Sequence, residues 1–449
     1  MFGSFLTGKV LMPAHEWVMR RGTFRALDEL LRARRLSGDQ IVALQAGKLC
    51  RLLVHARDRV PWYRERMRTF GDPAHEDPWQ LLASLPLVAR SDVQQHLAEF
   101  VAEGATGLAA GRTSGSSGEP LRFYLDAARM AADKAARYRA QLDWGVGVGD
   151  RKVWLWGRPA SPSWKDRLKS LRDRAMNERV LGAYEMTGER MCEYVATLRR
   201  WRPRSVTCYP SAAWRLCRFA LDHGLDLRQA GIGLWFTTGE MLQDHHRSTI
   251  EQASGGRVAN EYGLREAGFV AHECPRGAMH VTAENVFLET VRADGSPAGH
   301  GLGEIVVTNL DNLGMPLIRY RTRDYGRLGR AECPCGWRTQ TLSDLAGRQS
   351  DFLIAADGTP TVGFALSRRF WDVPGVRQFR VVQESLAATR VLVVAGQGFG
   401  EESRRRIVET IREVLGPGVT VDVEQVEAIP PEANGKTGYI QSRIAGEYL

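Results

Sequence analysis

Apolar residues recur with a period near 3.6 over roughly residues 20–100, which predicts a series of amphipathic helices. Prolines interrupt the pattern at residues 61–63 and 85–87, where we expect breaks between helices. From about residue 150, short apolar runs alternate with amphipathic stretches. This alternation is typical of an α/β domain built from layered sheets and helices.

The alternating region contains three expected strands that end in turns, and two expected helices between them. The strands are residues 152–157, 205–210 and 234–239, and the helices are 189–199 and 212–223. Residues 286–291 and 303–308 then form an expected strand pair around a loop with glycine and proline. A more β-rich section therefore follows the α/β region.

The pattern restarts after Gly347 with a ββαβ-like unit. Its expected elements are strands at 379–382, 389–394 and 419–423 and a helix at about 401–415. We therefore predict an α/β protein with two domains. The large N-terminal domain spans residues 1–346, with a helical start at 1–100, and a small mobile α+β domain spans residues 347–449.

Composition indicates an ordinary globular protein, with 43% hydrophobic residues in a chain of 449. No run approaches the roughly 18 apolar residues of a membrane span, and residues 1–9 lack a signal-peptide layout. We expect a cytoplasmic location. The net charge of +9 comes from basic residues dispersed along helix faces, so we expect no nucleic-acid or membrane partner, although the positive field would favour a small anionic substrate.

The seven cysteines are odd in number and unevenly spaced, so a disulfide framework is not expected. Four of them lie in apolar contexts and are interpreted as core residues: Cys50, Cys192, Cys208 and Cys217. The adjacent His245 and His246 are interpreted as surface groups.

A Ser/Gly-rich loop is the strongest local signal in the chain. It consists of Thr113, Ser114, Gly115, Ser116, Ser117 and Gly118. Its small residues can bring backbone N–H groups and hydroxyls around phosphate oxygens, although it lacks the Gly-Lys-Ser/Thr ending of a Walker loop. A flexible linker is the alternative, but the apolar residues that follow, beginning at Leu121, tie the loop to a strand.

Two acidic segments are candidates for nucleotide contacts. The ring of Tyr262 can stack on a purine, Gly263 follows it, and Glu266 can hold a divalent cation that bridges phosphates. Alternatively, Glu266 pairs with a neighbouring arginine. Asp324 offers a carboxylate suited to two ribose hydroxyls, with a charged turn at a strand end as the alternative.

Lys436 is the only lysine after Lys169, in a chain with 54 arginines and 7 lysines. Lysine carries a compact, mobile charge that can reach a single oxygen, which arginine cannot do in the same way. A lone lysine in an arginine-rich chain therefore suggests a chemical requirement, and chance is the alternative.

In this order and spacing, the segments resemble the acyl-adenylate-forming (AMP-binding) superfamily, and specifically its phenylacetate–CoA ligase-like branch. The loop at residues 113–120 resembles that family's phosphate loop, and residues 262–266 resemble its Tyr-Gly-x-x-Glu segment. Residues 321–324 resemble the ribose-binding segment, residues 347–351 resemble the Gly-Arg-x-x-Asp hinge, and residues 435–436 resemble the catalytic lysine element.

The resemblance implies an enzyme that activates a carboxylate with ATP and Mg²⁺. Glu266 would hold Mg²⁺, Asp324 would bind the ribose, Arg348 would support ribose or phosphate, and Lys436 would bridge the carboxylate and the α-phosphate. Asp351 would be the pivot about which the C-terminal domain rotates between two half-reactions.

The acyl group would then pass to the thiol of CoA, or alternatively to a carrier-protein thiol or an amine. A non-catalytic binding protein with the same fold is a further alternative. The carboxylate is expected to be aryl or apolar because aromatic residues lie at strand ends, where they line a pocket or belong to the core: Trp156, Tyr209, Trp235 and Phe236. The oligomeric state, monomer or homodimer, stays open.

Four soft ligands form a candidate metal site: Cys274, His280, Cys333 and Cys335. Three thiols and one imidazole are enough to close a tetrahedral zinc site. Some phenylacetate–CoA ligase-like proteins are similar here and carry a structural zinc. His272 is an alternative to His280. The opposing interpretation is that these residues are unrelated.

Overall fold

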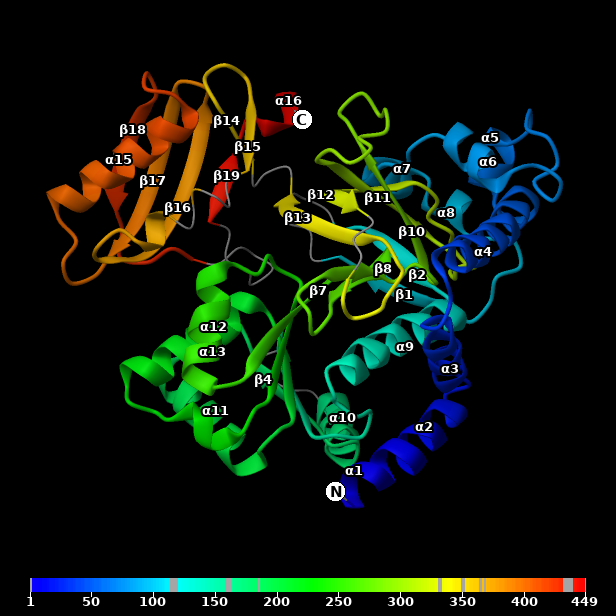
Figure 1. The fold of residues 1–449 in the computed structure, drawn as a ribbon, viewed down its shortest axis with the longest axis horizontal. Coiled ribbons are helices and arrows are strands. Elements are labelled where there is room, and N and C mark those ends of the chain that lie inside the picture. Colours follow the sequence, from blue (N-terminus) through cyan, green and yellow to red (C-terminus); the bar gives the residue numbers. More distant parts are fainter. Residues whose placement is uncertain are drawn as a thin grey trace.

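The structure is a computed structural model. It describes residues 2–113, 120–157, 164–184, 186–329, 333–348, 352–362, 366, 369–430 and 439–448. In the described part, helices dominate the first hundred residues, an eleven-stranded sheet forms the centre, and a four-stranded sheet forms the C-terminal part (Figure 1). The predicted α/β class is therefore confirmed.

The N-terminal helices run along one side of the molecule (Figure 1). They are α1 (Phe2–Leu6), the π-helix η1 (Thr7–Leu11), α2 (Met12–Val18), α3 (Thr23–Ala33), α4 (Gly38–Arg59), α5 (Pro61–Arg66), α6 (Pro78–Ser84), α7 (Arg90–Gln95) and α8 (Leu97–Phe100). Ser37 caps α4 by accepting from the backbone N–H of Gln40, and Pro61 begins α5 at the predicted break. Apolar faces of α4 to α8 pack with the antiparallel half of the central sheet, whereas α2 and α3 pack with residues 135–140 in a separate core.

A short hairpin precedes the central sheet. It pairs β1 (Ala109–Arg112) with β2 (Arg122–Leu125). The central sheet has the order β10-β11-β12-β13-β9-β8-β7-β6-β5-β3-β4. Its strands are β3 (Lys152–Trp156), β4 (Glu178–Gly182), β5 (Ser205–Cys208), β6 (Leu234–Thr238), β7 (Arg257–Leu264), β8 (Gly268–Glu273), β9 (Met279–Val281), β10 (Val286–Val291), β11 (Gly303–Asn309), β12 (Tyr320–Gly329) and β13 (Thr341–Arg348).

The central sheet changes character at β7. From β4 to β7 neighbouring strands are parallel, whereas from β7 to β10 they are antiparallel. Strands β5 and β6 are continuous runs of buried residues, as expected for strands covered on both faces, whereas the edge strand β4 is half-buried. The end of β7 is therefore where the two halves of the sheet meet.

Helices cover the parallel half on both faces. They are α9 (Ala127–Asp143), α10 (Trp164–Ala175), α11 (Gly188–Trp201), α12 (Pro210–Asp222), the 3-10 helix η2 (Leu227–Ala230) and α13 (Asp244–Ser254). Side chains from α11, α12 and α13 form one core with β3, β5 and β6. That core contains Trp235, and Phe236 is buried in a smaller one, so both aromatics serve the core.

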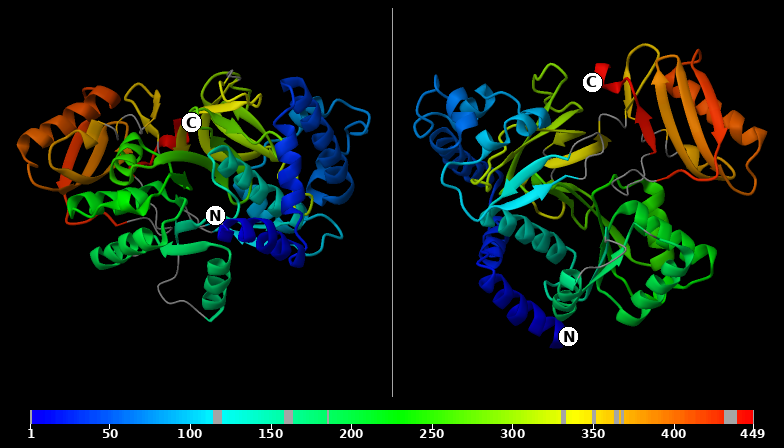
Figure 2. Two further views of the ribbon diagram at one scale, coloured as in Figure 1. Left: turned by 60° about the horizontal axis from the view of Figure 1, so that its bottom comes forward. Right: turned by 180° about the vertical axis from the view of Figure 1, so that it is seen from behind.

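The C-terminal part has its own sheet and core. The order is β18-β17-β16-β19, and the strands are β16 (Val376–Ser385), β17 (Ala388–Ala395), β18 (Thr420–Gln425) and β19 (Ile440–Ser442). Helix α15 (Glu401–Leu415) packs on this sheet, a two-stranded ribbon joins β14 (Phe352–Ile354) to β15 (Pro360–Val362), and α16 (Ala445–Tyr448) follows β19. Figure 2 shows this sheet standing beside the central one.

Two predictions about individual residues are wrong. Cys192 is exposed on α11, although Cys208 and Cys217 are buried as predicted and Cys50 is half-buried. His246 was predicted as a surface group but is fully buried, and His245 is half-buried. Both histidines point to a contact that only the tertiary structure creates, described below.

Candidate active site

The candidate active site is built around the turn that connects β7 and β8. Tyr262 lies near the end of β7, and Glu266 lies in the turn. The hydroxyl of Tyr262 donates to Oδ2 of Asp324 at 2.9 Å. The hydroxyl of Tyr320 donates to Oε1 of Glu266 at 3.2 Å. Strand β12 therefore offers one hydroxyl and one carboxylate to this turn, and the structure brings three of the predicted site residues together.

Burial sets the electrostatic character of this group. The pKa of the Glu266 carboxyl is raised above its ordinary value, mainly because the residue is buried, while the hydrogen bond from Tyr320 offsets part of that effect. The nearby charge of Asp324 also disfavours ionisation of Glu266. Two carboxyl groups in one partly buried region favour the arrival of a cation, and their oxygens are the ligands that Mg²⁺ prefers.

The close approach of β7 and β8 requires a glycine at position 263. A Cβ atom at this position would lie 2.5 Å from the carbonyl oxygen of Gly268 on the opposite strand. Only glycine therefore permits the two strands to approach as they do before the turn. The residue predicted to contact nucleotide thus shapes the turn that carries Glu266.

The β12–β13 hairpin places two further candidates opposite each other. In the antiparallel register, Asp324 pairs with Arg348, which is the last residue of β13. Arg323 adopts a left-handed backbone conformation with φ of 61°, and the hydroxyl of Thr322 accepts from the N–H of Asp324. The backbone bends at this position, so Asp324 sits at an irregular point of an otherwise regular hairpin.

The base of the Ser/Gly loop is fixed to the same site. The N–H of Thr113 donates to the carbonyl oxygen of Leu121, and the Thr113 hydroxyl accepts from the N–H of Leu121, both at 3.0 Å. Arg265, beside Glu266, donates to the carbonyl oxygen of Arg112 at 2.6 Å. The loop therefore begins and ends next to the β7–β8 turn.

Several predicted residues lie outside the described part of the chain. They are Ser114, Gly115, Ser116, Ser117, Gly118, Asp351 and Lys436. For Arg348 the backbone is described. The proposals made for these residues below rest on the sequence and on the positions of their described neighbours.

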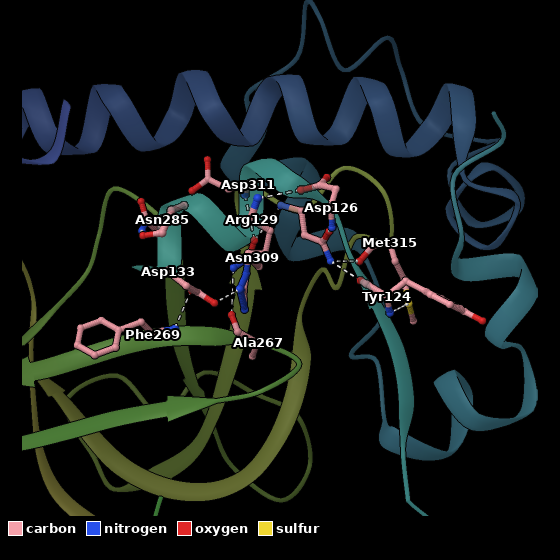
Figure 3. Close-up of polar contacts among 12 residues, drawn as sticks. Tyr124, Asp126, Arg129, Asp133, Ala267, Phe269, Asn285, Asn309, Asp311 and Met315 are labelled. Carbon is pink, nitrogen blue, oxygen red and sulfur yellow. Dashed lines mark hydrogen bonds and ion pairs between the residues drawn. The ribbon is translucent and has the colours of Figure 1, made fainter. Parts of the chain in front are cut away.

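A polar network behind the β7–β8 turn holds it in place (Figure 3). The side-chain amide of Asn309 donates to the carbonyl oxygen of Ala267 at 3.0 Å, and Asp133 accepts from the N–H of Phe269 at 3.0 Å. Arg129, which is fully buried, pairs with Asp133. These contacts fix both sides of the turn and thereby position Glu266.

The sequence reasoning missed this network. Its only signal was the cluster of amide and acidic side chains in residues 309–312, directly after β11. Such residues favour turns by accepting from nearby backbone N–H groups, and Asn309 accepts in this way from Asp311 and Asn312. Nothing in the sequence shows that the same amide reaches Ala267.

Two of the four predicted pocket aromatics form a stacked pair at the ends of the parallel strands. The rings of Trp156 and Tyr209 lie 4.1 Å apart, centroid to centroid. Gly239 packs under them, because a Cβ atom there would be 3.1 Å from the Tyr209 ring. The pair therefore lies at the carboxyl ends of β3 and β5, the edge of the sheet where α/β proteins bind ligands, with Tyr209 buried in the core and Trp156 half-buried.

The four predicted metal ligands come together. The ligand atoms of Cys274, His280, Cys333 and Cys335 all lie within 4.8 Å of one another. Sγ of Cys274 is 3.7 Å from Sγ of Cys333, and Sγ of Cys335 is 3.2 Å from Nε2 of His280. His272 is not in this group and instead lies 3.6 Å from Asp143.

The donor set fits a tetrahedral metal ion. The hydroxyl of Thr339 lies 3.5 Å from Nδ1 of His280, which leaves Nε2 directed at the sulfur atoms. Burial lowers the pKa of His280 to about 4, so the imidazole is neutral and has a lone pair to offer. Three thiols and one imidazole form the set that zinc prefers in structural sites.

An aromatic and histidine cluster joins the C-terminal part to α12 and α13. Nε2 of His246 lies 3.3 Å from the hydroxyl of Tyr439, and the ring of His245 packs on Trp371 at 4.4 Å. Trp214 of α12 packs on Trp371 at 5.3 Å. The cluster is therefore a contact between the C-terminal part and the helices of the parallel half. Tyr439 is the first described residue after the segment that contains Lys436.

The mixed eleven-stranded sheet and the C-terminal α+β unit together resemble the fold of solved acyl-CoA ligases. A solved structure of 2-hydroxyisobutyryl-CoA ligase, in the postadenylation state with R3-HIB-AMP, matches 92% of each chain with a TM-score of 0.73 at 19% identity. The same enzyme in the thioesterification state, with 2-HIB-AMP and CoA, matches 93% of each chain with a TM-score of 0.58 at 17% identity.

Sequence relatives support the phenylacetate–CoA ligase-like branch of the adenylate-forming superfamily. The chain is 26% identical over 340 residues to phenylacetate-coenzyme A ligase of Thermus thermophilus, covering 71% of this chain and 73% of the relative. It is 23% identical over 365 residues to Protein CapK of Staphylococcus aureus, covering 80% of each chain. Residues 353–443 match the family model of the CapK C-terminal domain.

Proposed function

We propose that this protein activates a carboxylic acid with ATP and transfers the acyl group to the thiol of CoA. The observation that carries the proposal is the pairing of two tyrosines on two carboxylates at the β7–β8 turn, beside the base of the Ser/Gly loop. The relatives named phenylacetate-coenzyme A ligase support the same activity.

In the first half-reaction a carboxylate oxygen attacks the α-phosphorus of ATP, and pyrophosphate leaves. We propose that residues 113–118 enclose the phosphates, Asp324 binds the ribose hydroxyls, and Arg348 supports ribose or phosphate. Tyr262 orients Asp324 through its hydrogen bond and presents a ring face to the base. These groups hold the nucleotide so that its α-phosphate faces the acid.

Glu266 is proposed to hold Mg²⁺, which when bound would neutralise negative charge on the phosphates. Tyr320 keeps the carboxylate in one orientation, and the buried turn removes competing water. Lys436 is proposed to place its charge between the carboxylate and the α-phosphate, where charge develops as the bond forms. Lys436 closely precedes Tyr439 in the sequence, and Tyr439 contacts His246. We therefore propose that the position of Lys436 depends on this contact between the domains.

The second half-reaction requires the C-terminal domain, proposed as residues 347–449 after an N-terminal domain of 1–346, to turn about Asp351. The observed arrangement matches the postadenylation state of 2-hydroxyisobutyryl-CoA ligase better than its thioesterification state, with TM-scores of 0.73 and 0.58. The arrangement therefore supports assigning this structure to the adenylation side of the cycle.

For the acid we propose an aryl or apolar carboxylate, because the stacked rings of Trp156 and Tyr209 offer a flat apolar surface. A carrier-protein thiol or an amine is the alternative acceptor. We also propose that the group of Cys274, His280, Cys333 and Cys335 binds a structural Zn²⁺. We propose a cytoplasmic location, because ATP and CoA are supplied there.

The test is ATP–pyrophosphate exchange with a panel of carboxylic acids, followed by mass analysis of products with and without CoA. Glu266→Gln removes the proposed cation ligand but keeps the size and the hydrogen bond from Tyr320, so exchange should fall by about 100-fold or more. Glu273→Gln, outside the proposed site, is the control. Exchange with no acid on the panel, or equal rates for both variants, would contradict the proposal.

A further inference from the structure

The first helical segment exposes an unusual amount of apolar surface. Helices α1, η1 and α2 run almost without interruption through residues 2–18. The exposed apolar side chains in and just after these helices are called the N-terminal stripe: Phe5, Leu6, Val10, Trp17, Val18 and Met19. Trp17 is 80% exposed, Val18 69% and Phe5 64%, values that are rare for such residues.

The orientation of this segment is fixed by polar contacts on its inner side. Thr7 accepts from the side-chain amide of Asn177 at 3.0 Å, and Glu16 pairs with Lys134 at 2.7 Å and also accepts from Thr23. Both Thr7 and Glu16 are buried. Rotating the helix to bury the N-terminal stripe would break these contacts. The contacts therefore keep the stripe exposed to solvent.

The charges around the stripe have one sign. Glu16 is the only acidic residue among residues 2–21, and it is buried against Lys134, whereas Lys9 and Arg20 are exposed. An apolar stripe with tryptophan and phenylalanine, flanked by cations only, is the pattern of a helix that lies in the interface of an anionic bilayer. Tryptophan favours that interface because one part of its ring is apolar and its N–H is polar.

Helix α10 also carries exposed apolar and basic side chains near the N-terminal stripe. One end of α10 lies near α1 in Figure 1, and Asn177, just after α10, donates to the hydroxyl of Thr7 in η1. Trp164 is 67% exposed and Leu171 is 65% exposed on α10, together with the cation Lys169. Two adjacent helices thus share exposed aromatic or aliphatic residues and positive charge.

We propose that the N-terminal stripe binds the surface of a membrane that contains anionic lipids, with the helix lying in the plane of the surface. No helix in the described part of the chain is long and apolar enough to span a bilayer, so the association is peripheral. This inference revises the expectation, drawn from the dispersed charges, that the protein has no membrane partner. A second copy of the chain fits less well, because Lys9 and Arg20 would face like charges across a self-paired interface.

The experiment is cosedimentation of the full-length protein with vesicles of phosphatidylcholine alone and of phosphatidylcholine with phosphatidylglycerol. We expect binding to the anionic vesicles only. The double variant Phe5→Ser, Trp17→Ser should lose it, and Lys9→Gln, Arg20→Gln should weaken partitioning roughly 30-fold, from about 1 kcal/mol per cation near such a surface. Val42→Ser, Leu221→Ser removes two apolar side chains elsewhere, which are 37% and 38% exposed, and should bind like the unmodified protein.

Circular dichroism and gel filtration of each variant establish that it is folded. Brominated lipids should quench tryptophan fluorescence in the unmodified protein and less in Trp17→Phe, which keeps the apolar surface and should still bind. Equal binding to both kinds of vesicle, no binding to either, or full binding by the Phe5→Ser, Trp17→Ser variant would overturn the proposal. So would a dimer in solution that the same variant converts to a monomer.

Discussion

The histidine cluster between the domains makes the observed arrangement sensitive to pH. Burial lowers the pKa of His245 to about 3 and that of His246 well below its ordinary value. When the domains separate, each imidazole regains water and a pKa near 6.5. The separated state therefore binds more protons, so the observed arrangement is favoured at higher pH and is lost as the pH falls below about 6.5.

The size of the effect follows from these values. At pH 5.5 a separated histidine with a pKa of about 6.5 is mostly protonated, whereas the buried one stays neutral, which shifts the equilibrium by about 1.4 kcal/mol, or about tenfold, per histidine. Burial is the first cause for both histidines, and the charged groups that act on their neighbour Tyr439, Arg215 and Glu240, have opposite signs. Burial of the two rings is therefore the dominant cause.

Limited trypsin digestion measures the separated population, because cleavage between the domains scales with the fraction that is open. The variant His245→Asn, His246→Asn keeps polar groups of similar size but cannot be protonated, and it also corrects for the pH dependence of trypsin. We expect the cleavage rate, relative to this variant, to rise about tenfold or more between pH 7.5 and pH 5.5. A constant ratio would show that the histidines do not control the domain contact.

Three further outcomes are expected. Lys436→Ala should abolish pyrophosphate exchange without changing the thermal unfolding midpoint, since the charge of Lys436 is proposed to act on the reacting phosphate and not in the core; a retained rate would remove Lys436 from the mechanism. Gly268→Ala should lower stability by about 1–3 kcal/mol in thermal unfolding, because φ is +122° and the added Cβ would lie 2.7 Å from Arg129, whereas Gly277→Ala, with open space around it and φ of +89°, should cost less. Metal analysis of the purified protein should find about one zinc per chain, reduced by Cys333→Ser; less than about a tenth of an equivalent would reject the site.

Local periodicity predicted the regular elements well where one period dominates. The helix expected at residues 401–415 is α15 (Glu401–Leu415), and the strand pair expected at 286–291 and 303–308 is the antiparallel pair β10–β11. The eleven-strand order was not predictable, because it depends on contacts between segments far apart in the chain. The N-terminal stripe was missed for the same reason, since exposure is a property of the packed structure.

The candidate site was predictable only in part. Glu266 and Asp324 were predicted because their segments resemble those of a known family, whereas each carboxylate alone had a structural alternative. The tyrosine hydroxyls that orient them do not stand out, because Tyr320 looks like any core aromatic in the sequence. His246 was misjudged because its burial requires Tyr439, which is almost 200 residues away.

The β12–β13 hairpin carries the proposed ribose carboxylate at one end and two proposed metal ligands at the other. Asp324 pairs with Arg348 at one end, and Cys333 and Cys335 lie in the connection at the other. The strands between these two ends are paired backbone to backbone, from Asp324 with Arg348 to Gly329 with Thr341. The proposed ribose carboxylate and two of the proposed metal ligands are thus parts of one hairpin, so a change that displaces this hairpin would be expected to act on both proposed sites.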